Sequence, residues 1–309
     1  MATVLVSEFM DGSALAFLEN RLSVDYAPNL FDDQQTLMQR VSAVDALIVR
    51  NRTPVTRELL NHAGQLKVIG RLGVGLDNID LDAAKQANIQ VLPATGANAV
   101  AVAEYVMSAL LHLRRPMTSG FQAMVGGDWP REQFIGGEIS GKTLGLIGFG
   151  QIAQIVAKRA AAFGMRIAYF DPYIDASEHD SVATAVSSLD ELLALSDSVS
   201  IHVPLTEDTH RLMNSQRLAL MKSGAILINT SRGGIVDERA LIHHIQTGHL
   251  GGAALDVFEH EPLDELKGAR FDGIDALILT PHIAGVTHES NRRVSQVTAE
   301  NVLRALGYE

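Results

Sequence analysis

The chain contains no cysteine among its 309 residues, which excludes disulfide bonds, thiolate catalysis and cysteine-ligated metals and favours a reducing compartment such as the cytoplasm. It also lacks a basic run, and 25 Lys+Arg against 36 Asp+Glu give a net charge of −11, which disfavours nucleic acid and anionic membrane surfaces as partners. No apolar run reaches the roughly 18 residues of a membrane span, and no signal peptide is evident. His243 and His244 are adjacent rather than spaced i,i+4, so no metal site is expected. These absences predict a soluble cytoplasmic protein.

What the chain does have is a regular alternation of short apolar runs with helical patterns, which is typical of βα units and parallel sheets. Because 309 residues exceed an ordinary single domain, two domains are expected. The first series of strands predicts a flavodoxin-like domain. Its expected strands are Thr3–Ser7, Ser23–Tyr26, Ala46–Arg50, Lys67–Arg71 and Ile89–Leu92.

A second series of six expected strands is about what a doubly wound, Rossmann-type nucleotide domain needs. These strands are Lys142–Gly148, Met165–Asp171, Ser198–Val203, Ala225–Thr230, Gly252–Phe258 and Ala276–Thr280. A long apolar helix over Asn98–Leu113 leads into this domain, and a last helix over Glu289–Leu306 is expected to return to the first. The predicted division is a discontinuous flavodoxin-like domain, 1–97 with 286–309, and a Rossmann-type nucleotide-binding domain, 98–285.

A glycine-rich fingerprint lies between an expected strand and the expected helix Gln151–Phe163. In this context Gly148 permits a tight turn and Gly150 lets the backbone approach a pyrophosphate. Such turns also occur without a nucleotide, but the next strand ends at Asp171, 21 residues past Gly150, where a carboxylate can bind the ribose hydroxyls. Asp171 would repel the 2′-phosphate of NADP, so NAD is the expected cofactor. The alternative for Asp171 is a turn-forming Asp-Pro.

Three side chains suited to acid–base chemistry follow strands of the nucleotide domain. Arg232 can grip a carboxylate with two parallel hydrogen bonds, His282 can give or take a proton near neutral pH, and Glu261 can hold the other imidazole nitrogen. Taken singly, they have simpler readings as a surface ion pair, a packed histidine and a loop carboxylate. Together, at the strand ends where open α/β sheets bind ligands, they predict hydride transfer on a 2-hydroxy or 2-oxo acid.

Longer motifs carry a resemblance to a known family. They are the segments 70–80 (GRLGVGLDNID), 96–104 (GANAVAVAE), 141–148 (GKTLGLIG) and 202–206 (HVPLT), together with the three segments around Arg232, Glu261 and His282. Over nearly its whole length the chain resembles the D-isomer-specific 2-hydroxyacid dehydrogenases, and most closely their 3-phosphoglycerate dehydrogenase branch.

The resemblance implies that a hydride passes between the substrate C2 and the nicotinamide C4, with Arg232 as anchor, His282 as acid/base and Glu261 as its partner. It implies that the backbone N–H groups of Val74 and Gly75 hold the substrate carboxylate, and that Asp256 binds the carboxamide. The residues expected at the cofactor are Gly148, Gly150, Gln151, Ile152, Asp171, His202, Pro204, Thr209, Thr230, Asp256 and His282. One departure is Ala101, where relatives often carry serine.

The identity of the substrate depends on Arg50, Arg52 and Arg71, which lie at strand ends of the first domain and can bind a second anionic group. In that case 3-phosphoglycerate or 3-sulfolactate fits. If these arginines are ordinary surface residues, a glyoxylate or hydroxypyruvate reductase is favoured.

A rival function comes from another class, because some NAD-sensing transcriptional corepressors are similar to this family and keep its Arg–Glu–His set. The chain shows no recruitment tail, which favours the enzyme. We also expect a homodimer, with the apolar stripe of Asn98–Leu113 and Trp129 at its interface.

Overall fold

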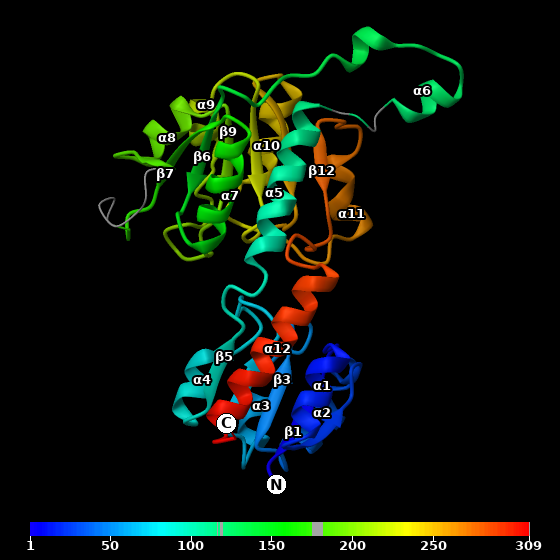
Figure 1. Cartoon of the computed structure of the whole chain (residues 1–309), viewed down its shortest axis with the longest axis vertical. Coiled ribbons are helices and arrows are strands. Elements are labelled where there is room, and N and C mark those ends of the chain that lie inside the picture. Colours follow the sequence, from blue (N-terminus) through cyan, green and yellow to red (C-terminus); the bar gives the residue numbers. More distant parts are fainter. Residues whose placement is uncertain (116, 118–119, 175–181, 309) are drawn as a thin grey trace. The chain divides into compact units, whose positions relative to one another are not determined.

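The computed structural model of the protein (Figure 1) describes residues 1–115, 117, 120–174 and 182–308. The chain forms two compact units. The first unit comprises Met1–Asn98 and Val286–Glu309, and the second unit comprises Ala99–Gly285. Each is built on a parallel β-sheet, which confirms the predicted α/β class.

The sheet of the first unit has the strand order β2-β1-β3-β4-β5, the order of flavodoxin-like folds. Its strands are β1 (Thr3–Val6), β2 (Ser23–Tyr26), β3 (Ala46–Val49), β4 (Val68–Arg71) and β5 (Gln90–Pro93). Its helices are α1 (Gly12–Glu19), η1 (Leu30–Asp32), α2 (Gln34–Val41), α3 (Arg57–His62), α4 (Leu81–Gln86) and α12 (His288–Ala305). Asp11, Asp33, Thr56 and Asp80 cap α1 to α4 by accepting backbone N–H groups, which fixes where each helix starts.

Helix α12 comes from the far end of the sequence and packs into the core of the first unit, where Val294 and Val302 are buried with Val4 and Val6 (Figure 1). Gly70 in β4 is what allows this close approach. A Cβ there would lie 2.7 Å from Cγ2 of Val302. The first unit is therefore completed only by the last helix of the chain.

The sheet of the second unit has seven parallel strands in the order β12-β11-β10-β9-β6-β7-β8. They are β6 (Thr143–Ile147), β7 (Arg166–Phe170), β8 (Thr184–Ala185), β9 (Ser198–Ile201), β10 (Ala225–Asn229), β11 (Leu250–Leu255) and β12 (Leu277–Leu279). The prediction of six strands was one short, because β8 has only two residues, both exposed, and no apolar run marks it. The order reverses direction between β6 and β9, which is where doubly wound sheets bind dinucleotides.

The helices of the second unit are α5 (Ala99–Arg114), α6 (Phe121–Val125), η2 (Arg131–Phe134), α7 (Gln151–Ala162), α8 (Leu189–Leu195), α9 (Ser215–Leu220), α10 (Glu238–Gln246), α11 (Glu265–Gly268) and η4 (Ala269–Phe271). The apolar stripe of α5 lies in the core against α7, with Val106 and Leu110 fully buried. The prediction that this stripe forms a subunit interface is therefore wrong. No helix in the described part of the chain combines the length and apolarity needed to cross a membrane.

Candidate active site

The turn between β6 and α7 has the geometry of a pyrophosphate site. Gly148 has φ +85°, and a Cβ there would lie 2.7 Å from the carbonyl oxygen of His202, so only glycine fits without a shift. Gly150 is the N-cap of α7, and a Cβ on it would meet no atom within 4 Å, so space is open beside this backbone. The side chain of Ala153, one turn into α7, is fully buried, which keeps the helix close to the sheet. At the start of the helix Gln151 is exposed and Ile152 is half-buried against the core.

Asp171 joins the end of β7 to this turn. Its Oδ2 accepts the N–H of Phe149 at 2.9 Å, and its Oδ1 accepts the N–H of Tyr173 at 2.9 Å. The second contact belongs to the Asp-Pro turn, the alternative role expected for Asp171. The first holds the fingerprint turn in shape. A carboxylate has about four acceptor sites, so it keeps capacity for ribose hydroxyls.

Polar side chains after β9 and β10 suit the other half of a dinucleotide. His202 is partly accessible as a residue, but its Nε2 is buried and, like Oγ1 of Thr230, has no hydrogen-bond partner among the described residues. Burial lowers the pKa of His202 to about 4, so the imidazole is neutral at pH 7. Thr209 closes the following turn by donating to the carbonyl of Pro204 at 2.6 Å. Buried polar atoms of this kind are suited to hydrogen-bond a bound polar ligand, so these residues fit NAD.

His282 and Glu261 form a direct pair after β12 and β11. The Nδ1 of His282 lies 2.8 Å from Oε2 of Glu261, and Oε1 of Glu261 accepts the N–H of Phe258 at 3.0 Å. Burial acts to raise the pKa of Glu261, but these hydrogen bonds and the charge of Arg232 outweigh it and lower that pKa. His282 has φ +57°, a strained backbone for a residue other than glycine.

Arg232 lies on a loop that packs against the same segment. Asn229, which is buried, shapes this loop by donating to the carbonyl of Arg232 and accepting the N–H of Ser231. A Cβ on Gly233 would overlap the Phe258 carbonyl, so the two loops are in backbone contact. The structure therefore brings together all three residues that the sequence proposes for catalysis.

A chain of hydrogen bonds that sequence reasoning missed lies behind His282. Tyr105 of α5 contacts the Thr280 hydroxyl at 2.6 Å, and Thr280 donates to Oδ1 of Asp256 at 2.6 Å. Asp256 is 1% exposed and accepts the N–H groups of Ile283 and Ala284. This carboxylate, expected at the carboxamide, thus also anchors the segment that carries His282. Nothing in the sequence pairs Tyr105 with Thr280.

The proposed substrate arginines lie in the first unit and differ in their surroundings. Arg50 is half-buried, its Nη2 donates to Oδ1 of Asn291 at 2.9 Å, and burial lowers its pKa. The Cζ atom of Arg52 lies 3.6 Å from the ring centroid of Phe31, and its Nη2 lies 3.5 Å from Oδ1 of Asp32. Their loop is held by the buried carboxylate of Glu8, which accepts the N–H groups of Arg50, Arg52 and Thr53.

Arg71 folds back onto Leu72 and Gly73, which directly precede Val74 and Gly75 in the chain. Its Nη1 donates to the carbonyl of Leu72 at 2.7 Å and lies where a Cβ of Gly73 would be. A residue with a side chain at 73 would displace the guanidinium. This segment thus combines a positive charge with backbone N–H groups, a suitable arrangement for an anion.

Comparison with known proteins agrees with this geometry. The family model for the NAD-binding domain of the D-isomer specific 2-hydroxyacid dehydrogenases matches residues 107–284. The chain is 51% identical over 308 residues to the (S)-sulfolactate dehydrogenase of Chromohalobacter salexigens, covering 99% of both chains. It is 39% identical to the D-3-phosphoglycerate dehydrogenase of Methanocaldococcus jannaschii, covering 99% of this chain but only 58% of that relative.

A solved structure shows the same architecture. The D-lactate dehydrogenase of Aquifex aeolicus, complexed with NAD and lactic acid, superposes with a TM-score of 0.86 at 30% identity, covering 99% of this chain and 96% of that one. The chain therefore belongs to the D-isomer specific 2-hydroxyacid dehydrogenases and is an NAD-dependent oxidoreductase acting on a CH–OH group.

Proposed function

We propose that the substrate is a small 2-hydroxy acid with a second anionic group at C3, with 3-sulfolactate as the first candidate and 3-phosphoglycerate as the second. The observation that carries this proposal is the 51% identity, over 99% of both chains, to a relative named for sulfolactate. The relative named for phosphoglycerate is less similar, at 39%.

In the proposed reaction the chain binds, orients and exchanges a proton. Arg232 holds the substrate carboxylate or carbonyl oxygen. In reduction the imidazole of His282 gives a proton to the C2 carbonyl oxygen, and in oxidation it takes the proton of the C2 hydroxyl. Glu261 orients the ring through Nδ1 and stabilises its protonated form, which leaves Nε2 for the substrate. Bound NAD supplies the hydride acceptor or donor.

Glu261 is suited to this role because its pKa is lowered, so it stays ionised throughout the neutral range. A neutral glutamic acid would not stabilise a charged imidazolium. Arg232 contributes twice, as the substrate anchor and as one of the charges that keep Glu261 ionised.

The second anion is assigned to the first unit, and its arginines are not equivalent. The charge of Arg52 is partly balanced by Asp32, whereas the guanidinium of Arg71 lies against Leu72 and Gly73, which directly precede Val74 and Gly75 in the chain. The charge of Arg50 is likewise close to the carboxylate of Glu8, so Arg71 is the stronger candidate for the anion at C3.

The test is a set of initial rates with NAD, and separately NADP, for (S)-3-sulfolactate, 3-phosphoglycerate, D-glycerate and D-lactate. Replacing Arg71 with Met is expected to lower kcat/KM for a doubly anionic acid about 10- to 100-fold, the loss of one charged hydrogen bond, with little effect on D-lactate. The matched control is Arg40→Gln, an arginine of the first unit in an exposed ion pair with Asp25. Equal losses on all four acids would refute the second anion site.

The remaining candidates give different outcomes in the same assay. Preference for a plain hydroxy acid would identify a glyoxylate or hydroxypyruvate reductase. A protein that binds NADH but turns over none of these acids would favour the NAD-sensing, corepressor-like function. The same assay also tests the choice of cofactor, because NAD is expected to support much faster turnover than NADP.

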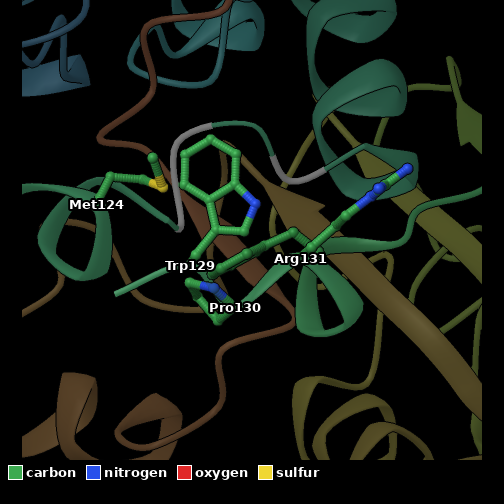
Figure 2. Close-up of a pocket in the computed structure, with 5 residues that line it drawn as sticks. Met124, Trp129, Pro130 and Arg131 are labelled. Atoms are coloured by element: carbon green, nitrogen blue, oxygen red, sulfur yellow. The ribbon is translucent and has the colours of Figure 1, made fainter. Parts of the chain in front are cut away.

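We further propose that the protein is a homodimer, joined through the segment between α5 and β6. Apolar side chains there are exposed, among them Phe121, Val125 and Trp129, the last 76% exposed. Met124 and Trp129 line a hollow of about 360 Å³ together with Pro130, Arg131 and Phe134. Figure 2 shows how Met124, Trp129, Pro130 and Arg131 lie around it. An apolar surface of this kind is typical of subunit interfaces.

Sedimentation equilibrium tests this proposal. The wild type is expected at twice its chain mass of 33.3 kDa and Trp129→Asp at the monomer mass. Leu266→Ser, a change of an exposed apolar residue on α11, is the control and should stay dimeric. A monomeric wild type would rule out the dimer.

A further inference from the structure

An ion pair between a buried carboxylate and a partly exposed guanidinium lies beside the segment that carries Glu261. Glu238, the first residue of α10, has a side chain only 2% exposed, and its Oε2 is 2.7 Å from Nη2 of Arg270 in η4. These two atoms are in charge contact rather than in a directed hydrogen bond. Arg270 also faces Glu259, with Nη1 3.7 Å from Oε2. The guanidinium of Arg270 thus lies within ion-pair distance of the carboxylates of both Glu238 and Glu259.

The ion pair of Glu238 and Arg270 is not well suited to stabilise the folded state by itself. Burial raises the pKa of Glu238, although Arg270 and a backbone hydrogen bond oppose that change. Taking the Glu238 carboxylate out of water costs several kcal/mol, and the attraction of Arg270, whose side chain is 30% exposed, offsets this cost only when the remaining polar atoms are satisfied. Here Oε2 of Glu238 and Nε of Arg270 are buried without a hydrogen bond among the described residues. The position of the pair therefore needs another explanation.

One contact with the backbone links Glu238 to the segment that carries Glu261. Oε1 of Glu238 accepts the N–H of Glu259 at 2.5 Å. Two residues further on, Glu261 accepts the N–H of Phe258 with one oxygen and faces His282 with the other. The segment 258–261 is thus closed on itself and fixed to α10 at its centre.

Neighbouring contacts hold the same segment from other directions. The rings of Phe258 and Phe271 meet edge to face, with centroids 5.9 Å apart, and the guanidinium of Arg270 lies 5.1 Å from the Phe271 centroid. The loop after Arg232 packs on the Phe258 carbonyl through Gly233. A shift of Glu259 would therefore be transmitted to Glu261 and to the loop of Arg232 together.

We propose that Glu238 and Arg270 are positioning residues for the acid–base pair, fixing the 258–261 segment so that Glu261 meets His282 at hydrogen-bonding distance. This inference rests on the proposed roles of Glu261 and His282. Neither Glu238 nor Arg270 need touch the substrate or the cofactor.

The test compares Glu238→Ala, which removes both contacts, with Glu238→Gln, which keeps an acceptor for the N–H of Glu259. Glu238→Ala is expected to lower kcat/KM at least 10-fold, in the range seen when supporting hydrogen bonds are lost, while the Kd of NADH changes less than about twofold. Its pH profile should approach that of Glu261→Gln. Glu238→Gln should retain more activity, and it serves as the test if Glu238→Ala does not fold.

The control is Asp190→Asn, which removes an exposed ion pair with Arg217 in the same unit. If Glu238→Ala loses thermal stability but keeps the wild-type pH profile, the pair is structural only and the proposal is wrong. Activity and profile equal to the control would also overturn it.

A second readout separates this proposal from the proposed function. The NMR signal of the His282 Nδ1–H in the cofactor-free protein, assigned with His282→Ala, reports the contact with Glu261 without any turnover. The signal should shift in Glu238→Ala and stay unchanged in Asp190→Asn. If the wild type oxidises no 2-hydroxy acid, the proposed function fails, and the His282 signal still decides whether Glu238 positions the pair. An unchanged signal in both Glu238 variants would overturn the inference.

Discussion

His202 should make the second unit lose stability as the pH falls from 7 to 5. Its folded-state pKa is about 4 against an ordinary value of 6.5, because the ring is buried. Between these two values the unfolded chain binds a proton that the folded chain does not bind. The unfolded state is therefore favoured as the pH falls, and the full contribution to stability is present only above about pH 6.5.

The size of the effect follows from the same two pKa values. Compared with a side chain that does not titrate, His202 lowers the free energy of unfolding by about 0.2 kcal/mol at pH 7 and by about 2 kcal/mol at pH 5, as proton linkage requires. For a unit of this size, 1 kcal/mol corresponds to roughly 2–4 °C in Tm, so the expected difference is about 4–8 °C.

Scanning calorimetry of the cofactor-free protein at both pH values measures this difference. The variant is His202→Gln, which keeps a polar side chain but does not titrate. The wild type should lose about 4–8 °C more than the variant in the transition of the second unit, while other titrating groups affect both proteins alike. If both proteins lose the same amount, His202 is protonated without cost in the folded chain, and the argument from its burial is refuted.

Three further outcomes are expected. Replacing Asp171 with Ala removes the acceptor of the Phe149 N–H as well as the proposed ribose ligand, so the Kd of NADH, measured by fluorescence, should rise at least about 10-fold; an unchanged Kd would contradict this. Gly233→Ala would press a Cβ into the Phe258 carbonyl and should lower kcat about 100-fold, whereas Gly268→Ala, whose Cβ meets only Leu263 at 3.9 Å, should not; similar rates would refute the loop contact. Thr280→Val breaks the link between Tyr105 and Asp256 and should cost about 1–3 kcal/mol of unfolding free energy, with no loss in urea titrations counting against it.

Sequence patterns predicted both sheets because each depends on local information. Apolar runs such as Ala46–Val49 and Ala225–Asn229 are buried along their whole length, which the sequence shows as continuous hydrophobic stretches. Strand β8 carries no such signal, since its two residues are exposed. The contact between Glu261 and His282, present in the structure, was predictable because both residues follow strands of one parallel sheet.

What sequence reasoning missed depends on partners far away in the chain. The stripe of α5 is apolar whether a second subunit or α7 covers it, and the pattern does not distinguish the two. Glu238 and Arg270 look like ordinary surface charges in the sequence, and only the fold brings them together and buries the side chain of Glu238. Tyr105 and Thr280 are 175 positions apart, and only the packing of α5 beside the sheet brings them into contact.

The place of α12 in the first unit has a consequence for how the protein is made. On the ribosome the five strands of that unit appear first, but the helix that buries Val4 and Val6 is translated only after the whole second unit. Folding in the order of synthesis, the usual course for multidomain chains, is thus blocked for the first unit. We expect the second unit to fold first during translation, while the nascent first unit keeps apolar surface exposed and depends on chaperones until α12 emerges.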